Sequence, residues 1–179
     1  DLPEGFVPQV RDMPKVLNFW RDLLERNGYL IFQTTRISLS VFRGLSIHHD
    51  HLPVILLNGA DSYAGKVFTI FHEIAHLANK TSGLCDLDRH VNEEAIANAF
   101  AANFLMPRRQ VESFIEGHDE NGLELARKMG EVFKVSLLAA GVRLRTLRFI
   151  NDDELEALRE ESDAAWADHR TAQKANPGG

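Results

Sequence analysis

The chain has almost no cysteine and no long hydrophobic run. Its 179 residues include one cysteine, Cys85, so neither a disulfide framework nor a four-cysteine zinc site can form. The longest apolar stretches, such as 54–57, cover only a few residues and are too short to cross a bilayer. No charged-then-apolar leader opens the sequence. Together with the lone thiol, these absences predict a cytoplasmic protein.

The chain also lacks an excess of positive charge. Its formal net charge is -6, which argues against bulk electrostatic capture of nucleic acid. Residues 120–150 are the exception, with six basic against three acidic side chains. The contents of 44% hydrophobic and 26% charged residues are those of an ordinary globular domain. Because the chain begins with Asp1 and ends in Pro177-Gly178-Gly179, we expect it to be a fragment of a longer protein.

The hydrophobic periodicity predicts an α+β fold. A helix at 13–26 precedes three strand-like runs, at 29–34, 39–47 and 53–58, which we expect to form a small, largely antiparallel three-stranded sheet. Only helices are predicted after the sheet, over 62–79, 89–106, 107–116, 121–133, 136–147 and 151–169. The chemistry of the chain is therefore expected on helices packed with a small sheet.

The segment His72-Glu73-Ile74-Ala75-His76 carries the main chemical motif. Two histidines four residues apart lie on one face of a helix, so both imidazoles can bind one metal ion, with Glu73 beside them. Two imidazoles and a carboxylate suit zinc and leave a fourth position open for water. A histidine pair on a helix is nevertheless more often a surface or packed pair. A metal site therefore requires a third ligand further along the chain.

Glu93 and Glu94 on the next predicted helix compete for the role of third ligand. As neighbours on a helix they point about 100° apart, so only one can reach the metal. Glu93 shares its face with three large apolar residues that we expect in the core: Ile96, Phe100 and Phe104. Glu94 shares its face with Ala97 and Ala101, whose small side chains would let two helices approach closely. We therefore predict Glu94 as the ligand and Asn98, one turn on, as a hydrogen-bond partner that orients a ligand.

Three segments together resemble the ImmA/IrrE family of bacterial zinc metallo-endopeptidases. They are FTIFHEIAHL at 68–77, EAIANAFA at 94–101 and Leu105-Met106-Pro107, and the resemblance covers about residues 40–150. It implies that His72, His76 and Glu94 bind one Zn²⁺ and that Glu73 is the general base. Phe71 and Ala75 depart from the family, which usually has a small residue and often glycine there. Neither departure removes a reacting group.

The resemblance also implies a domain division and a function. The implied parts are a zincin-like metallopeptidase domain at 1–118, a helix-turn-helix-like region at 119–150 and an acidic C-terminal helix with a linker end at 151–179. The implied activity is site-specific cleavage of a helix-turn-helix repressor, which would regulate stress, conjugation or phage genes. Three residues are candidate donors to the developing oxyanion, and the sequence does not choose among them: Tyr63, His90 and Arg109. The alternatives are a DNA-bound regulator that keeps the fold and metal, and a silent scaffold tied together by zinc.

Three further features of the sequence have both a functional and a purely structural interpretation. The run His48-His49-Asp50-His51 could bind a second metal ion, but a solvated turn is the preferred interpretation. Cys85 could approach the zinc, although an inert thiol is preferred. Residues 121–148 have the outline of a helix-turn-helix, with arginines at 143, 145 and 148. Because arginines commonly line a solvated face and an acidic helix follows, we expect no DNA binding by this chain alone.

Overall fold

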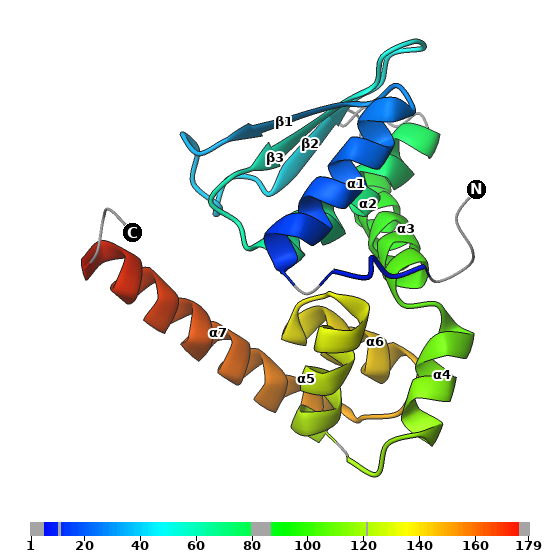
Figure 1. Ribbon diagram of the computed structural model, residues 1–179, viewed down its shortest axis with the longest axis vertical. Coiled ribbons are helices and arrows are strands. Elements are labelled where there is room, and N and C mark those ends of the chain that lie inside the picture. The colour runs from blue at the N-terminus through cyan, green and yellow to red at the C-terminus, as the bar shows by residue number, and fades with distance from the viewer. Residues whose placement is uncertain (1–5, 11, 80–86, 121, 176–179) are drawn as a thin grey trace. The chain divides into compact units, whose positions relative to one another are not determined.

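The computed structural model describes residues 6–10, 12–79, 87–120 and 122–175. The chain divides into two compact units, one made of residues 1–107 with 133–135 and the other of 108–132 with 136–179. The first contains the sheet and helices α1 to α3, and the second contains most of α4 to α7 (Figure 1). The division at 118 and 150 that the family resemblance implies stays a prediction.

In the first unit a three-stranded sheet lies over three helices (Figure 1). Its elements are α1 (Met13–Arg26), β1 (Leu30–Thr34), β2 (Gly44–Ile47), β3 (Val54–Asn58), α2 (Tyr63–Asn79) and α3 (Leu87–Leu105). Helix α2 packs against α1, α3, β2 and β3, so it is the central helix of the unit. The motif at 72–76 lies on this helix.

The sheet has the strand order β1-β3-β2, with β3 parallel to β1 and antiparallel to β2. The predicted α+β fold with a small three-stranded sheet is confirmed, and the sheet is mixed. The most apolar strand, β3, occupies the centre, where Ile55 and Leu57 are fully buried. The second strand is shorter than the predicted run at 39–47, because Val41 and Phe42 donate their backbone N–H groups to Ser38 O in a turn.

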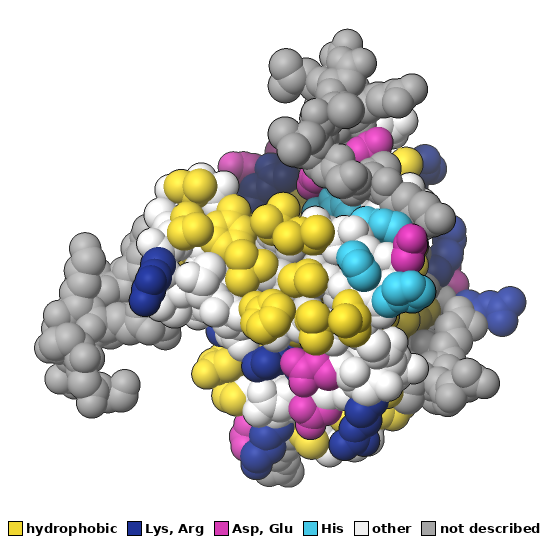
Figure 2. All heavy atoms as spheres, turned by 90° about the horizontal axis from the view of Figure 1, so that it is seen from above, with side chains coloured by type: hydrophobic (Ala, Val, Ile, Leu, Met, Phe, Trp, Pro, Cys, Tyr) yellow, Lys and Arg dark blue, Asp and Glu magenta, His cyan; other side chains and the backbone are white. Residues whose placement is uncertain are grey.

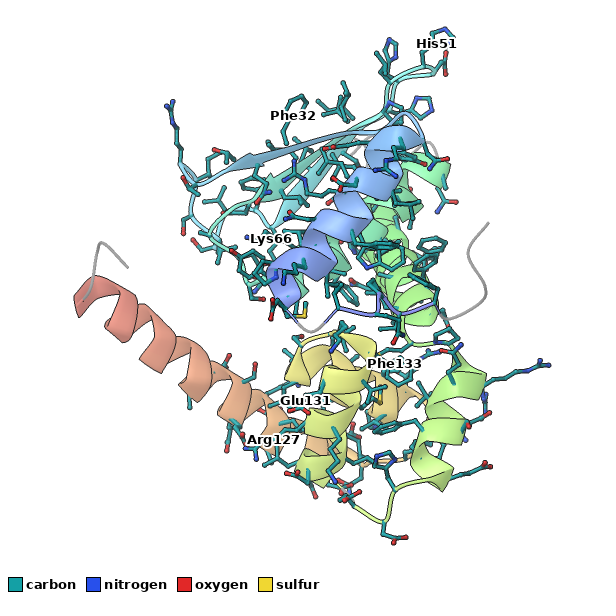
Figure 3. The ribbon with its side chains drawn as sticks, viewed as in Figure 1. Phe32, His51, Lys66, Arg127, Glu131 and Phe133 are labelled. Carbon is teal, nitrogen blue, oxygen red and sulfur yellow. The ribbon has the colours of Figure 1, made fainter. Side chains whose placement is uncertain are left out.

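The two faces of the sheet differ in what covers them. Ile31 on β1 is buried with Ile55 and Leu57, whereas the opposite face exposes large apolar side chains. These are Leu30, Phe32, Leu45 and Ile47, with exposed fractions of 38–55%. Hydrophobic side chains gather over this part of the surface in Figure 2, and Phe32 points away from the helices in Figure 3. The described sheet is therefore covered by helices on one face only.

Small residues form the contact between α2 and α3, as the sequence predicts. Ala97 and Ala101 are buried, whereas the face of Ile96, Phe100 and Phe104 is 39–49% exposed. The expectation that this second face belongs to the core is wrong, because a surface helix buries one face and the alanines occupy it. Phe104 still stacks on buried Phe71 at 4.2 Å between ring centroids. The large Phe71 side chain, on α2, thus packs against α3.

The second unit is helical. Its elements are α4 (Arg108–Glu116), α5 (Gly122–Phe133), α6 (Leu137–Thr146) and α7 (Asp152–Ala175). Ser136 caps α6 by accepting the N–H of Ala139, and Asn151 and Glu154 form a reciprocal capping box at the start of α7. None of the helices that the structure describes, in either unit, is long and apolar enough to cross a membrane.

Candidate metal centre

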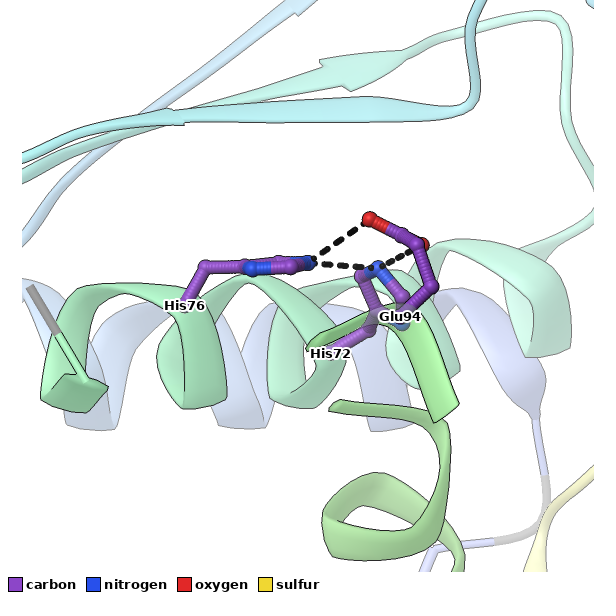
Figure 4. A group of neighbouring side chains, drawn as sticks. All are labelled: His72, His76 and Glu94. Atoms are coloured by element: carbon purple, nitrogen blue, oxygen red, sulfur yellow. Dashed lines mark hydrogen bonds and ion pairs between the residues drawn. The ribbon is translucent and has the colours of Figure 1, made fainter. Parts of the chain in front are cut away.

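Two imidazoles and one carboxylate converge between α2 and α3 (Figure 4). The Nε2 atoms of His72 and His76 lie 3.1 Å apart. The Glu94 carboxylate places Oε2 3.2 Å from the first of these nitrogens and Oε1 3.1 Å from the second. The structure thus brings Glu94, and not its neighbour Glu93, to the histidine pair.

The spacing of these atoms fits a small divalent cation. Ligands at about 2.0–2.2 Å from a tetrahedral ion lie roughly 3.3–3.6 Å from one another. The separations of 3.1 and 3.2 Å are only slightly shorter than this range. Two ring nitrogens and a carboxylate that face one another are best satisfied by a shared cation, since each can supply a lone pair. The donor set therefore suits Zn²⁺.

Asn98 lies where the sequence predicts an orienting partner. Its Oδ1 lies 3.0 Å from Nδ1 of His72, so the ring donates its Nδ1–H to the amide oxygen. This tautomer leaves the Nε2 lone pair of His72 directed toward His76 and Glu94. Asn98 lies one helical turn beyond Glu94 on α3. The same helix thus carries one candidate ligand, Glu94, and the hydrogen-bond acceptor of another, His72.

The Glu73 carboxylate is buried beneath β2, with only 6% of the residue exposed. Its Oε2 accepts a hydrogen bond of 2.6 Å from the Ser46 hydroxyl. Burial raises the pKa of the Glu73 carboxyl, and nearby Glu94 adds to this effect. The Ser46 hydrogen bond and the field of His76 act in the opposite direction on the same pKa. Sequence reasoning missed the role of Ser46, because no spacing rule links a strand residue to a helix residue 27 positions later.

Asn58 holds the segment that leads into β2. Its side chain is fully buried and donates to the backbone carbonyls of Ile37 and Phe42, at 2.9 and 3.0 Å. It also accepts the N–H of Ala60 at 3.0 Å. One buried amide thereby fixes the loop before β2 and the turn after β3.

Of the three candidate oxyanion donors, Tyr63 lies in the same unit as the candidate ligands and its side chain is described, and it stands well away from them. Tyr63 is in the first turn of α2, nine residues before His72, which is about 13 Å along the helix axis. Its exposed ring lies against the Lys66 ammonium, 4.4 Å from the ring centroid. Arg109 is exposed on α4 in the second unit, and the side chain of His90 lies outside the described part of the chain. Which donor serves the site stays a prediction.

The histidine run at 48–51 forms a turn. His49 Nδ1 accepts the backbone N–H groups of His51 and Leu52, at 3.3 and 3.2 Å, and His51 lies at the tip of this loop in Figure 3. Within the described ranges, the only group of three or more potential metal ligands is His72, His76 and Glu94. The preference for a solvated turn over a second metal site agrees with this arrangement. Cys85 lies outside the described residues.

The predicted helix pair at 121–148 is present as α5 and α6, joined by a turn at 134–136. Arg143 is 4% exposed, and the Arg145 guanidinium binds both carboxylate oxygens of Asp152 at 2.5 and 2.8 Å. Arg148 is exposed at the end of α6. Burial of Arg143 and pairing of Arg145 with Asp152 therefore leave two of the three arginines poorly available to contact a phosphate backbone.

Comparison with known proteins gives one family assignment. The family model of Peptidase M78, described as the IrrE N-terminal-like domain, matches residues 28–145. No curated protein matches the chain. A solved structure, described as a Mycobacterium tuberculosis transcriptional regulator, is similar at 18% sequence identity with a TM-score of 0.48. The match covers 76% of this chain and 42% of that one, so this chain spans less than half of that protein. The family model, by contrast, matches most of this chain. The chain therefore belongs to the Peptidase M78 family, with an IrrE N-terminal-like domain.

Proposed function

We propose that the chain is a zinc-dependent endopeptidase that cuts a protein substrate. The observation that carries the proposal is the convergence of His72, His76 and Glu94 beside the buried Glu73 carboxylate. Membership in a peptidase family supports it, because the same chain brings together a metal-binding triad and a carboxylate of the kind that moves protons. A bound zinc ion would polarise the scissile carbonyl and acidify a water molecule.

In this proposal each residue of the site has a separate role. His72, His76 and Glu94 hold the metal, and Asn98 keeps His72 in the tautomer that can bind it. Glu73 accepts a proton from the attacking water and returns it to the leaving amine. Its raised pKa suits this exchange, because a carboxyl with a pKa nearer neutrality both takes and gives a proton more readily.

The position of β2 favours an extended peptide as the substrate. In the described sheet β2 is an edge strand, it packs on α2, and its Ser46 contacts Glu73. An extended peptide can add to such an edge by main-chain hydrogen bonds. A peptide bound there would run past the carboxylate and the metal ligands. Exposed Leu45 and Ile47 on the same strand offer apolar contacts beside that edge.

The proposed substrate is a helix-turn-helix repressor in the cytoplasm, whose cleavage would switch on transcription. The resemblance in the segments at 68–77 and 94–107 supports this choice. The alternative, a DNA-bound regulator with little proteolysis, has less support from α6, where Arg143 is buried and Arg145 is paired with Asp152. The two proposals differ in what Glu73 should do, because a regulator would function without a general base.

Replacement of Glu73 tests the proposal. Wild type and Glu73→Gln, each loaded with Zn²⁺, are incubated with a proteome-derived peptide library and with the helix-turn-helix protein encoded nearest to the gene. We expect Glu73→Gln to bind zinc as wild type does and to cleave about 10²–10⁴-fold more slowly, which is the contribution of a general base. Equal cleavage by the two proteins, or none by either, would refute the proposal. A sequence-specific DNA complex that is unaffected by Glu73→Gln would favour the regulator.

A further inference from the structure

Strand β2 has an unusual pattern of side chains. Its outward positions are Leu45 and Ile47, which are 49% and 55% exposed, while the positions that face α2 are Gly44 and Ser46. Side chains alternate between the faces of a strand, so a half-buried strand normally directs its apolar residues toward the core. Here the inward positions are the smallest residue and a small hydroxyl residue. The pattern indicates that the inward face of β2 accommodates something polar.

That polar group is the Glu73 carboxylate. The Ser46 hydroxyl donates to its Oε2 at 2.6 Å, within the range of a strong bond to an ionised oxygen. A Cβ added at Gly44 would lie 2.8 Å from Glu73 Oε1 and 3.2 Å from its Cγ, and would also collide with the Cγ2 methyl of Thr69. The Ser46 hydroxyl therefore bonds one carboxylate oxygen, and the other oxygen lies where a side chain at position 44 would stand. Both constraints come from β2.

We infer that Ser46 is a positioning residue that holds the Glu73 carboxylate in one orientation, in space that Gly44 leaves open. The inference rests on the proposed function only in taking Glu73 as the general base. A glutamate side chain has three rotatable bonds, and holding it in place before substrate arrives removes an entropic cost from the reaction. A buried carboxylate also requires hydrogen-bond partners, and Ser46 supplies one without introducing a charge.

The test compares two variants of Ser46 with a matched control. Ser46→Ala removes the hydroxyl, and Ser46→Thr keeps it on a residue that strands favour. Ser40→Ala is the control, since the Ser40 hydroxyl is exposed and bonds to Ser38 Oγ. For each zinc-loaded full chain, kcat and KM are measured on the library peptide that wild type cleaves fastest. The Zn²⁺ dissociation constant and a crystal structure are obtained in parallel.

We expect Ser46→Ala to lower kcat about 10- to 100-fold, since a misplacement of about 1 Å at a reacting group can cost that much. KM and the Zn²⁺ dissociation constant should stay within about threefold of wild type, because Ser46 contacts neither metal ligands nor, in this proposal, the substrate side chains. Ser46→Thr should recover most of kcat, and the control should not change it. In the crystal structure of Ser46→Ala the carboxylate should leave its place over Gly44. These shifts are not expected of a residue that only stabilises the fold.

A second pair of variants tests the space at Gly44. Gly44→Ala is combined with Thr69→Ser, which deletes the methyl group that the new Cβ would strike. The combined variant keeps the close approach to Glu73 Oε1 and should lower kcat as Ser46→Ala does, while Thr69→Ser alone should not. This pair shows the effect of displacing the carboxylate without removing a hydrogen-bond donor.

Wild-type kcat in Ser46→Ala, or an unmoved Glu73 in its crystal structure, would overturn the inference. If wild type cleaves no faster than Glu73→Gln, the proposed function fails. The crystal structures of Ser46→Ala and Ser46→Thr then decide the positioning role alone: a displaced carboxylate in the first and a retained one in the second support it.

Discussion

Replacement of Asn98 by alanine should weaken zinc binding without touching any ligand. The His72 Nδ1–H donates to Asn98 Oδ1 at 3.0 Å, and this bond keeps the proton off the Nε2 atom that faces His76 and Glu94. Without the acceptor, a share of the molecules carries the proton on Nε2 and must lose it before the metal binds. Partners of metal-bound histidines are typically worth 10- to 100-fold in affinity. Because Asn98 is exposed and water can replace its oxygen, we expect the lower end, about tenfold or about 1.4 kcal/mol.

The assay is a competition titration of Zn²⁺ between the protein and a chromophoric chelator at neutral pH. Asn103→Ala is the matched control, because Asn103 lies on the same helix and donates its amide to Ala99 O, one turn back along α3. Asn98→Asp is the opposite perturbation, since a carboxylate is a stronger acceptor for the Nδ1–H, and it should keep or increase the affinity. A dissociation constant for Asn98→Ala within twofold of wild type would refute the argument that Asn98 sets the tautomer.

Three stability predictions follow from the packing and the caps. Ala101→Leu should lower the free energy of unfolding by about 1–3 kcal/mol and weaken Zn²⁺ binding, because the larger side chain forces α3 away from α2. Unchanged zinc affinity would show instead that the interface adapts to the larger residue. Asn58→Ala leaves the Ile37 and Phe42 carbonyls without their donor, so it should lower the free energy of unfolding by about 2–4 kcal/mol, measured by chemical denaturation. A loss under about 0.5 kcal/mol would contradict the role of this amide. Asn151→Ala removes the cap of α7 and should cost about 1 kcal/mol, read from the second unit's unfolding, with no change in zinc affinity.

The elements, and the meeting of the three candidate ligands, could be predicted from local patterns. The spacing of His72 and His76 on a helix, and the small residues beside Glu94, involve one helix or one helix pair, where periodicity determines which side chains meet. The capping box at Asn151 is similarly local, and the structure contains both of its hydrogen bonds. Such features depend on residues three or four positions apart, so one sequence is enough to find them.

Features that depend on distant segments could not be predicted in the same way. Strand β1 pairs in parallel with β3 and not with β2, the next strand along the chain, and no local pattern in either strand determines this choice. The Phe100 and Phe104 face is exposed because the alanine face packs against α2, a choice between two apolar stripes that hydrophobicity alone assigns wrongly. The contact of Ser46 with Glu73 joins a strand to a helix. A sequence signal for this contact is the inverted pattern of β2, with small residues inward and Leu45 and Ile47 outward.

We propose above all that His72, His76 and Glu94 bind one zinc ion. Anomalous difference density, measured at the zinc edge from crystals of the chain grown with equimolar Zn²⁺, tests it most directly. We predict one peak at about 2.0–2.2 Å from Nε2 of both histidines and from a carboxylate oxygen of Glu94. A zinc peak elsewhere in the molecule, with no density among these three side chains, would contradict it.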